Sequence, residues 1–410
     1  MRASILRFGT DQLSAIQDSL VLEPQACPPA SALRDGDVIV TVRAAEVVWT
    51  DTIMITGQYQ HQPRLPYTPG MTYAGIVHSS TPKAAAAGFV AGSRVAIAGW
   101  DAGPRSHGAY QSFGGCASYA VAPMSAIRRV PASWSFEEAA CFAYGYDTAY
   151  HCLVEVGKVK PGESILIQGA TGGVGIPAVK IAVMLGLKVI AVTRDAEKSA
   201  FLRQLGVTDI IVLEPRQQPK RQAALTAQAL PPTPQTAPSS PQQRGGGSSF
   251  AQRVKALTGG KGVDIVYDGV GGNAITVESM RALRFGGRLL IVGWAATPNV
   301  AQANRSKGAA TNANVIPTNL IMMKSLQVLG CPAMIAAKMD PAVADRRVAD
   351  LERWFNERKL SPPEVGKIFP LSEIRDAFRS RVNSGGSIGS CIVVPPLPTA
   401  ERVTSATSKL

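Results

Sequence analysis

The sequence contains no apolar run long enough to cross a membrane. Its 410 residues are 46% hydrophobic, but no stretch of about 18 residues is without polar side chains. The longest apolar run lies around Val189–Val192 and is bounded by Lys188 and Arg194, so we expect no membrane span. Charged residues amount to only 17%, a composition typical of a packed globular enzyme rather than a disordered chain. The length allows two or three domains with buried cores.

Paired cysteines are also missing. The six cysteines stand singly and no CxxC pair occurs, which excludes a zinc knuckle or a redox dithiol of that pattern. This usage agrees with a reducing intracellular compartment. Residues 1–9 contain no apolar run of the kind that a signal peptide needs, so we expect no secretory route. The cysteines are Cys27, Cys116, Cys141, Cys152, Cys331 and Cys391.

No block of lysine and arginine accompanies the high positive charge. The formal net charge is +13, yet the basic residues are spread along the chain without an interleaved aromatic repeat. Anionic small ligands account for this charge as well as a nucleic acid would. We therefore expect a nucleotide cofactor as the anionic partner and no nucleic acid.

The final tripeptide, Ser408-Lys409-Leu410, matches the peroxisomal address. That signal is read only at a free C-terminus, and the preceding residues 395–407 have the composition of an exposed tail. We expect a peroxisomal import receptor as a partner and a peroxisome or peroxisome-like organelle as the location. The alternative is a chance tripeptide in a cytoplasmic protein.

The pattern of elements changes near residue 133. Before it, short β-rich runs alternate with turns, which indicates a small, mainly β unit. After it, predicted strands and helices alternate, which indicates a parallel doubly wound sheet with helices on both faces. Residues 215–249 interrupt the pattern with a segment rich in Pro, Gln, Ser and Gly, which we interpret as a disordered surface insertion.

A glycine-rich turn carries the strongest functional signal. The apolar strand Ser164–Ile167 runs into this turn, and a helix is predicted from Gly175 to Leu185. Glycines let the backbone approach a pyrophosphate, and the helix N-terminus offers free N–H groups to its charge. The predicted cofactor contacts in the turn are Gly169, Gly172, Gly173, Val174 and Gly175.

The end of the following strand, Val189–Val192, decides the cofactor type. An acidic residue there would hold the ribose hydroxyls of NAD, whereas an arginine can pair with a 2′-phosphate. This chain has Thr193 and Arg194, with Lys198 one turn into the next predicted helix. The pattern favours NADPH, while Asp195 keeps NADH as the minority interpretation.

Several runs together resemble the medium-chain dehydrogenase/reductase superfamily, in its zinc-independent quinone oxidoreductase-like branch. The resemblance extends from Met1 to about Pro396, apart from the insertion. It is carried by Ala44-Ala45 with Asp51, Gly57-Gln58-Tyr59, Leu65–Gly70, Gly145–Ala149, the turn 169–175, Tyr267–Gly272, Phe285–Arg288, and Asn319-Leu320 with Lys324 and Gly330.

The resemblance implies the division of the chain and its α/β fold class. We expect the first part of a GroES-like, mainly β catalytic domain over residues 1–132 and a Rossmann NADPH-binding domain over 133–344. The chain would return to the GroES-like domain over 345–396 and end in a tail over 397–410. The segment Leu326–Leu329 resembles the edge strand through which such enzymes dimerise, so we expect a homodimer.

Zinc ligands are absent from the positions that the alcohol dehydrogenases of the superfamily use. Those enzymes have a Cys and a His where this chain has Val48 and Met71, and neither side chain is a typical Zn²⁺ donor. The four-cysteine structural lobe is missing too. We expect no metal, and Val48, where the branch usually has an Asn, makes the predicted pocket less polar.

Without zinc, the resemblance implies hydride transfer from NADPH to an electron-poor conjugated acceptor, such as a quinone, an enone or an enoyl thioester. Tyr59 is the candidate proton donor, and a packing or substrate-stacking tyrosine is the equally weighted alternative. Thr148 is expected in the N-terminal turn of a helix, facing the cofactor phosphates. Val270, Val292 and Gly293 are carried over as further cofactor contacts at strand ends.

Two other functions remain open. A peroxisomal trans-2-enoyl-CoA reductase would suit the peroxisomal address. A non-catalytic NADPH-binding or RNA-binding protein, like the lens crystallins among these relatives, would suit the loss of the polar residue at Val48.

Overall fold

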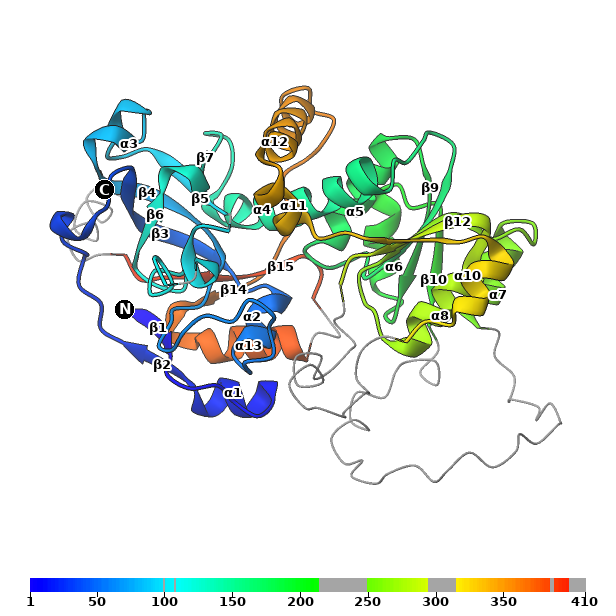
Figure 1. Ribbon diagram of the computed structural model, residues 1–410, viewed down its shortest axis with the longest axis horizontal. Coiled ribbons are helices and arrows are strands. Elements are labelled where there is room, and N and C mark those ends of the chain that lie inside the picture. The colour runs from blue at the N-terminus through cyan, green and yellow to red at the C-terminus, as the bar shows by residue number, and fades with distance from the viewer. Residues whose placement is uncertain (99, 107, 214–248, 294–314, 384–386, 398–410) are drawn as a thin grey trace.

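The computed structural model describes the chain except residues 99, 107, 214–248, 294–314, 384–386 and 398–410. Two lobes stand side by side, a mainly β lobe in blue and cyan and a parallel-sheet lobe in green and yellow (Figure 1). The expected insertion 215–249 and the peroxisomal tripeptide thus fall almost wholly or wholly outside the described residues. Among the described helices, none is both long and apolar enough to span a bilayer.

The β lobe is built on one sheet of seven strands. The order is β14-β15-β3-β4-β5-β7, and β6 also pairs with β3. Strand β3 is almost wholly buried because neighbouring strands flank it and the lobe's core packs against it. The strands are β3 (Asp37–Glu46), β4 (Thr72–Ser80), β5 (Arg94–Ile97), β6 (Tyr119–Pro123), β7 (Ile127–Arg129), β14 (Val365–Pro370) and β15 (Ser390–Val394), beside the separate pair β1 (Arg2–Ile5) and β2 (Leu20–Glu23).

The second lobe contains a six-stranded parallel sheet. Its order is β10-β9-β8-β11-β12-β13, so numbered from β8 along the chain it has the 3-2-1-4-5-6 order of a dinucleotide-binding fold. This confirms the predicted α/β class. The strands are β8 (Ser164–Gln168), β9 (Lys188–Thr193), β10 (Asp209–Val212), β11 (Val263–Asp268), β12 (Leu283–Ile291) and β13 (Gln327–Gly330).

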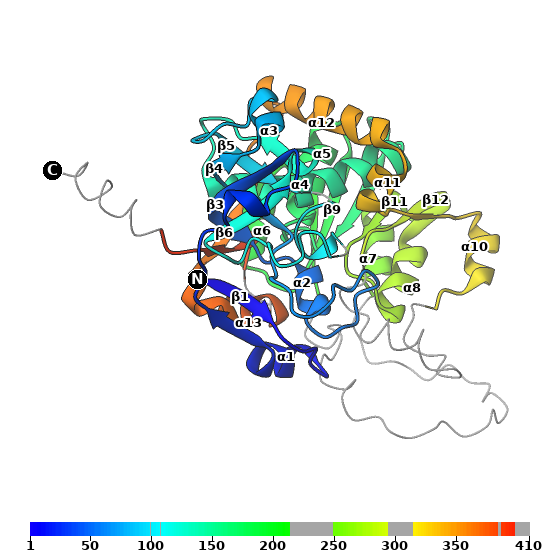
Figure 2. The same ribbon diagram turned by 60° about the vertical axis from the view of Figure 1, so that its left-hand side comes forward.

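Helices cover both faces of the parallel sheet and part of the β lobe. In the parallel-sheet lobe they are α5 (Gly175–Met184), α6 (Lys198–Gln204), α7 (Phe250–Leu257), α8 (Asn273–Ala282), α10 (Thr318–Lys324), α11 (Ala333–Met339) and α12 (Pro341–Asn356). The β lobe has α1 (Gln12–Asp18), α2 (Trp49–Met54), α3 (Pro82–Ala86) and α13 (Ile374–Val382). Figure 2 shows α1 and α13 together at one end of that lobe.

Helix α4 (Phe136–Tyr150) joins the two lobes. Ser135 caps its N-terminus, and its hydroxyl accepts a hydrogen bond from the Glu138 N–H at 3.1 Å. Ala139 and Ala140 pack against the β sheet, whereas Tyr146 and Tyr150 belong to the core of the parallel-sheet lobe. One rigid helix therefore fixes both lobes.

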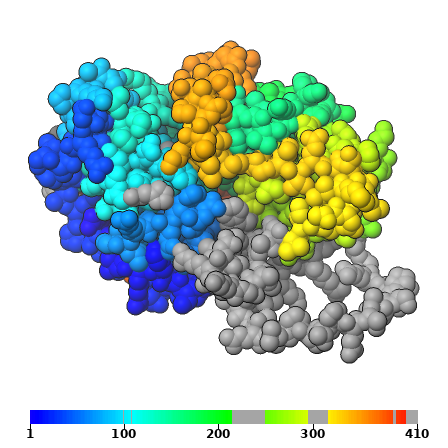
Figure 3. Space-filling view, viewed as in Figure 1, coloured from blue at the N-terminus to red at the C-terminus, as the bar shows by residue number. Residues whose placement is uncertain are grey.

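The return to the β lobe takes place after α12. The boundary expected between residues 344 and 345 falls inside this helix, whose Leu351 and Trp354 pack into the core of the parallel-sheet lobe. Strand β14 then enters the β sheet and pairs with β15. In the space-filling view, the orange segment of α11 and α12 lies over the boundary between the lobes (Figure 3).

Candidate functional site

The glycine-rich turn connects β8 to α5 where the strand order reverses. Gly169 has a φ of +69°, which favours glycine. A Cβ atom on Gly175 would lie 2.0 Å from the Gly169 carbonyl oxygen, so no side chain fits there. The turn therefore brings backbone to the start of α5, a geometry that fits the pyrophosphate of a dinucleotide.

The β lobe touches this turn directly. The Gly389 N–H donates to the Thr171 carbonyl at 2.9 Å. A Cβ atom on Gly173 would lie 2.7 Å from Ser390 Oγ and 2.9 Å from Glu46 Oε1. The predicted cofactor site thus lies at the contact between the two lobes, and Gly173 lets them meet.

The corner after β9 brings the predicted 2′-phosphate residues together. Helix α6 begins at Lys198, later than the predicted Ala196, because residues 195–197 form a turn in which Asp195 Oδ1 accepts the Glu197 N–H at 3.0 Å. Arg194 is exposed and Lys198 is nearly buried. Burial lowers the pKa of Lys198, Asp195 raises it and the neighbouring Arg194 lowers it further. Two cations therefore share this corner with Thr193.

The ends of three neighbouring strands converge beside the turn. Val270 follows β11, and its Cγ2 would lie 3.6 Å from a Cβ atom on Gly169. The N–H groups of Val292 and Gly293, after β12, both donate to the Asp268 carbonyl, at 3.1 and 3.3 Å. The structure brings these predicted contacts to the same edge of the sheet as the glycine-rich turn.

Thr148 lies elsewhere on its helix than predicted. It occupies the last turn of α4, which continues into the π-helix His151–Val156, so it is not in a helix N-terminal turn. Its hydroxyl donates to the Tyr144 carbonyl at 2.7 Å. The sequence motif did not reveal the helix start at Ser135, so the expected position was wrong.

Tyr59 sits in a cluster of aromatic and basic side chains in the loop after α2. It is only 8% exposed. The guanidinium carbon of Arg105 lies 5.6 Å from the centre of its ring, and the ring of His61 lies 5.7 Å away in an edge-on arrangement. Tyr59 is thus held on the side of the site formed by the β lobe, with a cation beside it.

A second tyrosine, missed in the sequence, lies in the same site. The Tyr144 hydroxyl is 2.9 Å from Thr50 Oγ1, and burial raises the pKa of Tyr144, while Arg105 and Thr50 lower it. The next residue, Gly145, approaches so closely that its Cβ atom would lie 2.5 Å from the Gly173 carbonyl oxygen. Tyr144 directly precedes the motif Gly145–Ala149, a position that could have identified it.

Two buried acids complete the polar part of the site. Glu46 and Asp51 are each 1% exposed. Burial raises the pKa of Glu46 to about 7, although Ser390 and Arg381 lower it. Burial likewise raises the pKa of Asp51 to about 6, against hydrogen bonds from the backbone N–H groups of Val48 and Gly70. No sequence motif pointed to Glu46, because its burial depends on long-range pairing of β3.

Apolar side chains occupy the two positions that hold catalytic zinc in the alcohol dehydrogenases. Val48 is 1% exposed and Met71 is 2% exposed, and both belong to the core of the β lobe. These residues therefore act in packing within the described structure. The absence of zinc from the reaction stays a prediction.

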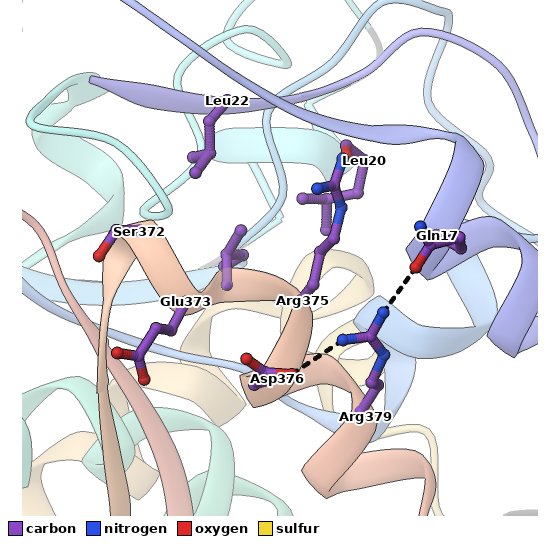
Figure 4. Close-up of a pocket in the computed structure, with 9 residues that line it drawn as sticks. Gln17, Leu20, Leu22, Ser372, Glu373, Arg375, Asp376 and Arg379 are labelled. Carbon is purple, nitrogen blue, oxygen red and sulfur yellow. Dashed lines mark hydrogen bonds and ion pairs between the residues drawn. The ribbon is translucent and has the colours of Figure 1, made fainter.

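The hollow drawn in Figure 4 lies outside this site. Residues of α1, β2 and α13 line it, and none belongs to the glycine-rich turn or to the Tyr59 cluster. Its charged groups pair with neighbours, since Arg379 bonds to Asp376 at 2.8 Å and to Gln17 at 2.6 Å. The hollow therefore gives no reason to move the candidate site.

The raised pKa of Glu46 predicts a pH-dependent stability. The folded chain holds this proton more tightly than the unfolded chain, so the associated stability is lost as the pH rises toward about 7. Glu46→Gln removes this titration. Relative to the parent, the variant should gain about 3 kcal/mol of unfolding free energy between pH 5 and pH 8, measured by denaturant unfolding. The exposed Glu352→Gln should follow the parent throughout, and a Glu46→Gln difference independent of pH would contradict the assignment.

Comparisons with known proteins agree with this architecture. The family description "Alcohol dehydrogenase GroES-like domain" matches residues 34–132, and "Zinc-binding dehydrogenase" matches residues 247–393. The human quinone oxidoreductase is 25% identical over 361 residues, which cover 88% of this chain and 90% of that protein. A quinone oxidoreductase-like protein 2 homolog of Nematostella vectensis is 26% identical, with 85% and 79% covered.

A solved structure extends the likeness to three dimensions. The quinone oxidoreductase of Thermus thermophilus, which was also solved in complex with NADPH, is 25% identical. It aligns over 96% of this chain and 100% of its own, with a TM-score of 0.67. Because both lobes, the strand order and the glycine-rich turn agree with these relatives, the chain belongs to the medium-chain dehydrogenase/reductase superfamily, in its quinone oxidoreductase-like branch.

Proposed function

We propose that this protein is an NADPH-dependent oxidoreductase that transfers hydride to a quinone or an activated alkene without zinc. The observation that carries the proposal is the close contact of the glycine-rich turn with the lobe that contains Tyr59 and Arg105. The naming of the human and Thermus thermophilus relatives as quinone oxidoreductases supports the acceptor class, and the solved NADPH complex of the latter supports the cofactor.

The chain's own residues divide the work by position. When bound, NADPH supplies the hydride. The turn 169–175 would hold the pyrophosphate through backbone N–H groups, and Arg194 with Lys198 would pair with the 2′-phosphate. Burial around Val48 and Met71 excludes water from one wall of the site. These roles fix the cofactor on the parallel-sheet lobe and leave the β lobe to bind the acceptor.

Reduction of a conjugated acceptor also requires a proton. Tyr59 is the proposed donor, because its ring is held beside Arg105 and its hydroxyl is a general acid that the site could use. Tyr144 is already hydrogen-bonded to Thr50, so its hydroxyl has a fixed partner. The two tyrosines therefore serve as test and comparison for one another.

A panel of acceptors tests the proposed function. Purified protein should oxidise NADPH in the presence of simple quinones or enones. Turnover of crotonyl-CoA without any quinone activity would instead select the enoyl-CoA reductase. A salt-dependent RNA mobility shift with no turnover of any acceptor would select the non-catalytic alternative.

Arg194→Ala should change cofactor preference. Loss of a charge-assisted pair to the 2′-phosphate should weaken NADPH binding by ~10- to 150-fold, while NADH binding changes little. Binding of each cofactor can be followed by isothermal titration. Lys188→Ala, which removes a cation from the other end of β9, should leave both affinities near those of the parent. Equal losses for NADPH and NADH in Arg194→Ala would refute the role.

Tyr59→Phe should lower turnover by ~10²- to 10⁴-fold if Tyr59 donates the proton, since the ring and its packing remain. The loss should be larger for an enoyl thioester, which gives a basic enolate, than for a quinone, which gives a stabilised anion. Steady-state kinetics with both acceptors measures this. Tyr144→Phe is the matched comparison, and it should cost less. Unchanged turnover in Tyr59→Phe with every active acceptor would remove Tyr59 from the reaction.

The proposed homodimer rests on β13, which forms an edge of the parallel sheet, as expected. Met322 and Met323 on the preceding helix α10 are 75% and 67% exposed. Replacing both with Glu should convert a dimer into a monomer, as measured by light scattering. Met339→Glu, at an equally exposed position on α11, should remain dimeric. A parent chain of monomeric mass would overturn the proposal.

Localisation in a peroxisome or peroxisome-like organelle stays a proposal. It rests on the tripeptide Ser408-Lys409-Leu410 alone.

A further inference from the structure

Arg105 is a buried cation without a counter-ion of its own. It ends the short helix Gly103–Arg105 and is 5% exposed. Within the described residues, its buried Nε has no partner and its side chain forms no hydrogen bond or ion pair. A buried charge of this kind is costly unless it is paired.

The nearby acid does not pair with Arg105. Asp51 is close enough for Arg105 to lower its pKa, but its two carboxylate oxygens accept the Val48 and Gly70 N–H groups at 3.0 and 3.3 Å. The closest compensation comes from two aromatic rings, with Tyr59 at 5.6 Å and Trp100 at 6.0 Å from the guanidinium carbon. Such contacts offset only part of the cost of burial.

A second cation approaches the same tryptophan from the other lobe. The Lys338 Nζ atom of α11 lies 5.0 Å from the centre of the Trp100 ring. The ring of His61 meets Trp100 edge-on at 4.4 Å. Trp100 is thus in contact with basic groups from both lobes, directly beside Tyr59. An aromatic wall with two cations suits a flat molecule that carries a negative charge.

We propose that Arg105 binds a carboxylate of the acceptor, so that this protein prefers acidic quinones or enones to neutral ones. The inference rests on the proposed function, because it assigns the acceptor to the Tyr59 side of the site. A guanidinium presents two parallel N–H groups to a carboxylate and would fix its orientation. Lys338 adds charge at the rim of the same site.

The chemistry limits where that carboxylate can be attached. Hydride transfer places negative charge on the conjugated system, and a carboxylate within that system would oppose it by repulsion. The acid group should therefore stand on a short saturated arm. Arg105 lies close enough to Tyr59 for the conjugated part to remain within reach of the proton donor.

A matched pair of acceptors tests the inference. A naphthoquinone with a propanoate arm and its methyl ester differ in charge and have the same ring. Arg105→Met should reduce kcat/KM for the acid by ~10- to 150-fold, mostly through KM, and change that for the ester by less than about threefold. Arg105→Lys should recover part of the loss, because it keeps the charge without the planar pair of donors.

A binding measurement separates this inference from the proposed reaction. Titration of the parent with naphthalene-propanoate, which cannot accept hydride, should show binding that weakens with salt and is lost in Arg105→Met. Lys338→Met changes an exposed residue and should fold, and it should weaken binding by a smaller factor. Circular dichroism and cofactor binding verify that each variant is folded.

The outcomes lead to distinct conclusions. Equal losses for acid and ester in Arg105→Met would overturn the inference, since the cation would then act on charge that develops in every acceptor. Salt-dependent binding of naphthalene-propanoate that needs Arg105, without turnover of either quinone, would support the anion site and reject the proposed reaction. Unchanged binding in both Arg105→Met and Lys338→Met would overturn the anion site whatever the turnover.

Discussion

The site depends on the absence of a side chain at Gly173. Ser390 and Glu46 from the β lobe occupy the space that its Cβ atom would need, and the Gly145 backbone of α4 approaches its carbonyl oxygen. Three segments that are distant in the sequence therefore meet in backbone contact at the glycine-rich turn. This contact sets the distance between the lobe that fits a dinucleotide and the lobe that would bind the acceptor, and a bulkier turn would force the two lobes apart.

Helix α4 makes this arrangement rigid because its two halves belong to different cores. Ala139 and Ala140 allow close packing on the β sheet, and Tyr146 fills the core under the parallel sheet. Tyr144 lies between these halves and is bonded to Thr50 of the β lobe. A side chain in this position is held by both lobes at once, so its hydroxyl has little freedom to reorient.

The sequence predicted the local features of the site and missed those created by long-range packing. The glycine-rich turn could be found because strand, turn and helix are consecutive in the chain. Glu46 and Arg105 could not, because one is buried by strand pairing and the other by the fold of a loop. Thr148 was assigned to the wrong end of a helix, since a short motif does not show where its helix begins. The predicted start of α6 failed for a related reason, the turn that Asp195 stabilises.

The buried arginines of the chain show what distinguishes a structural charge from one that is available to a ligand. Arg347 is 1% exposed, and it donates to both carboxylate oxygens of Glu155, at 3.0 and 2.9 Å, and to the Ala333 carbonyl. Its charge is thus satisfied within the protein, where it ties α12 to the π-helix. Arg105 is buried to a similar degree but has only aromatic faces and a preoccupied carboxylate around it among the described residues. Folding cannot have selected Arg105 for an internal ion pair that does not exist there, and the cost of its burial is most simply offset when an anion enters beside Tyr59.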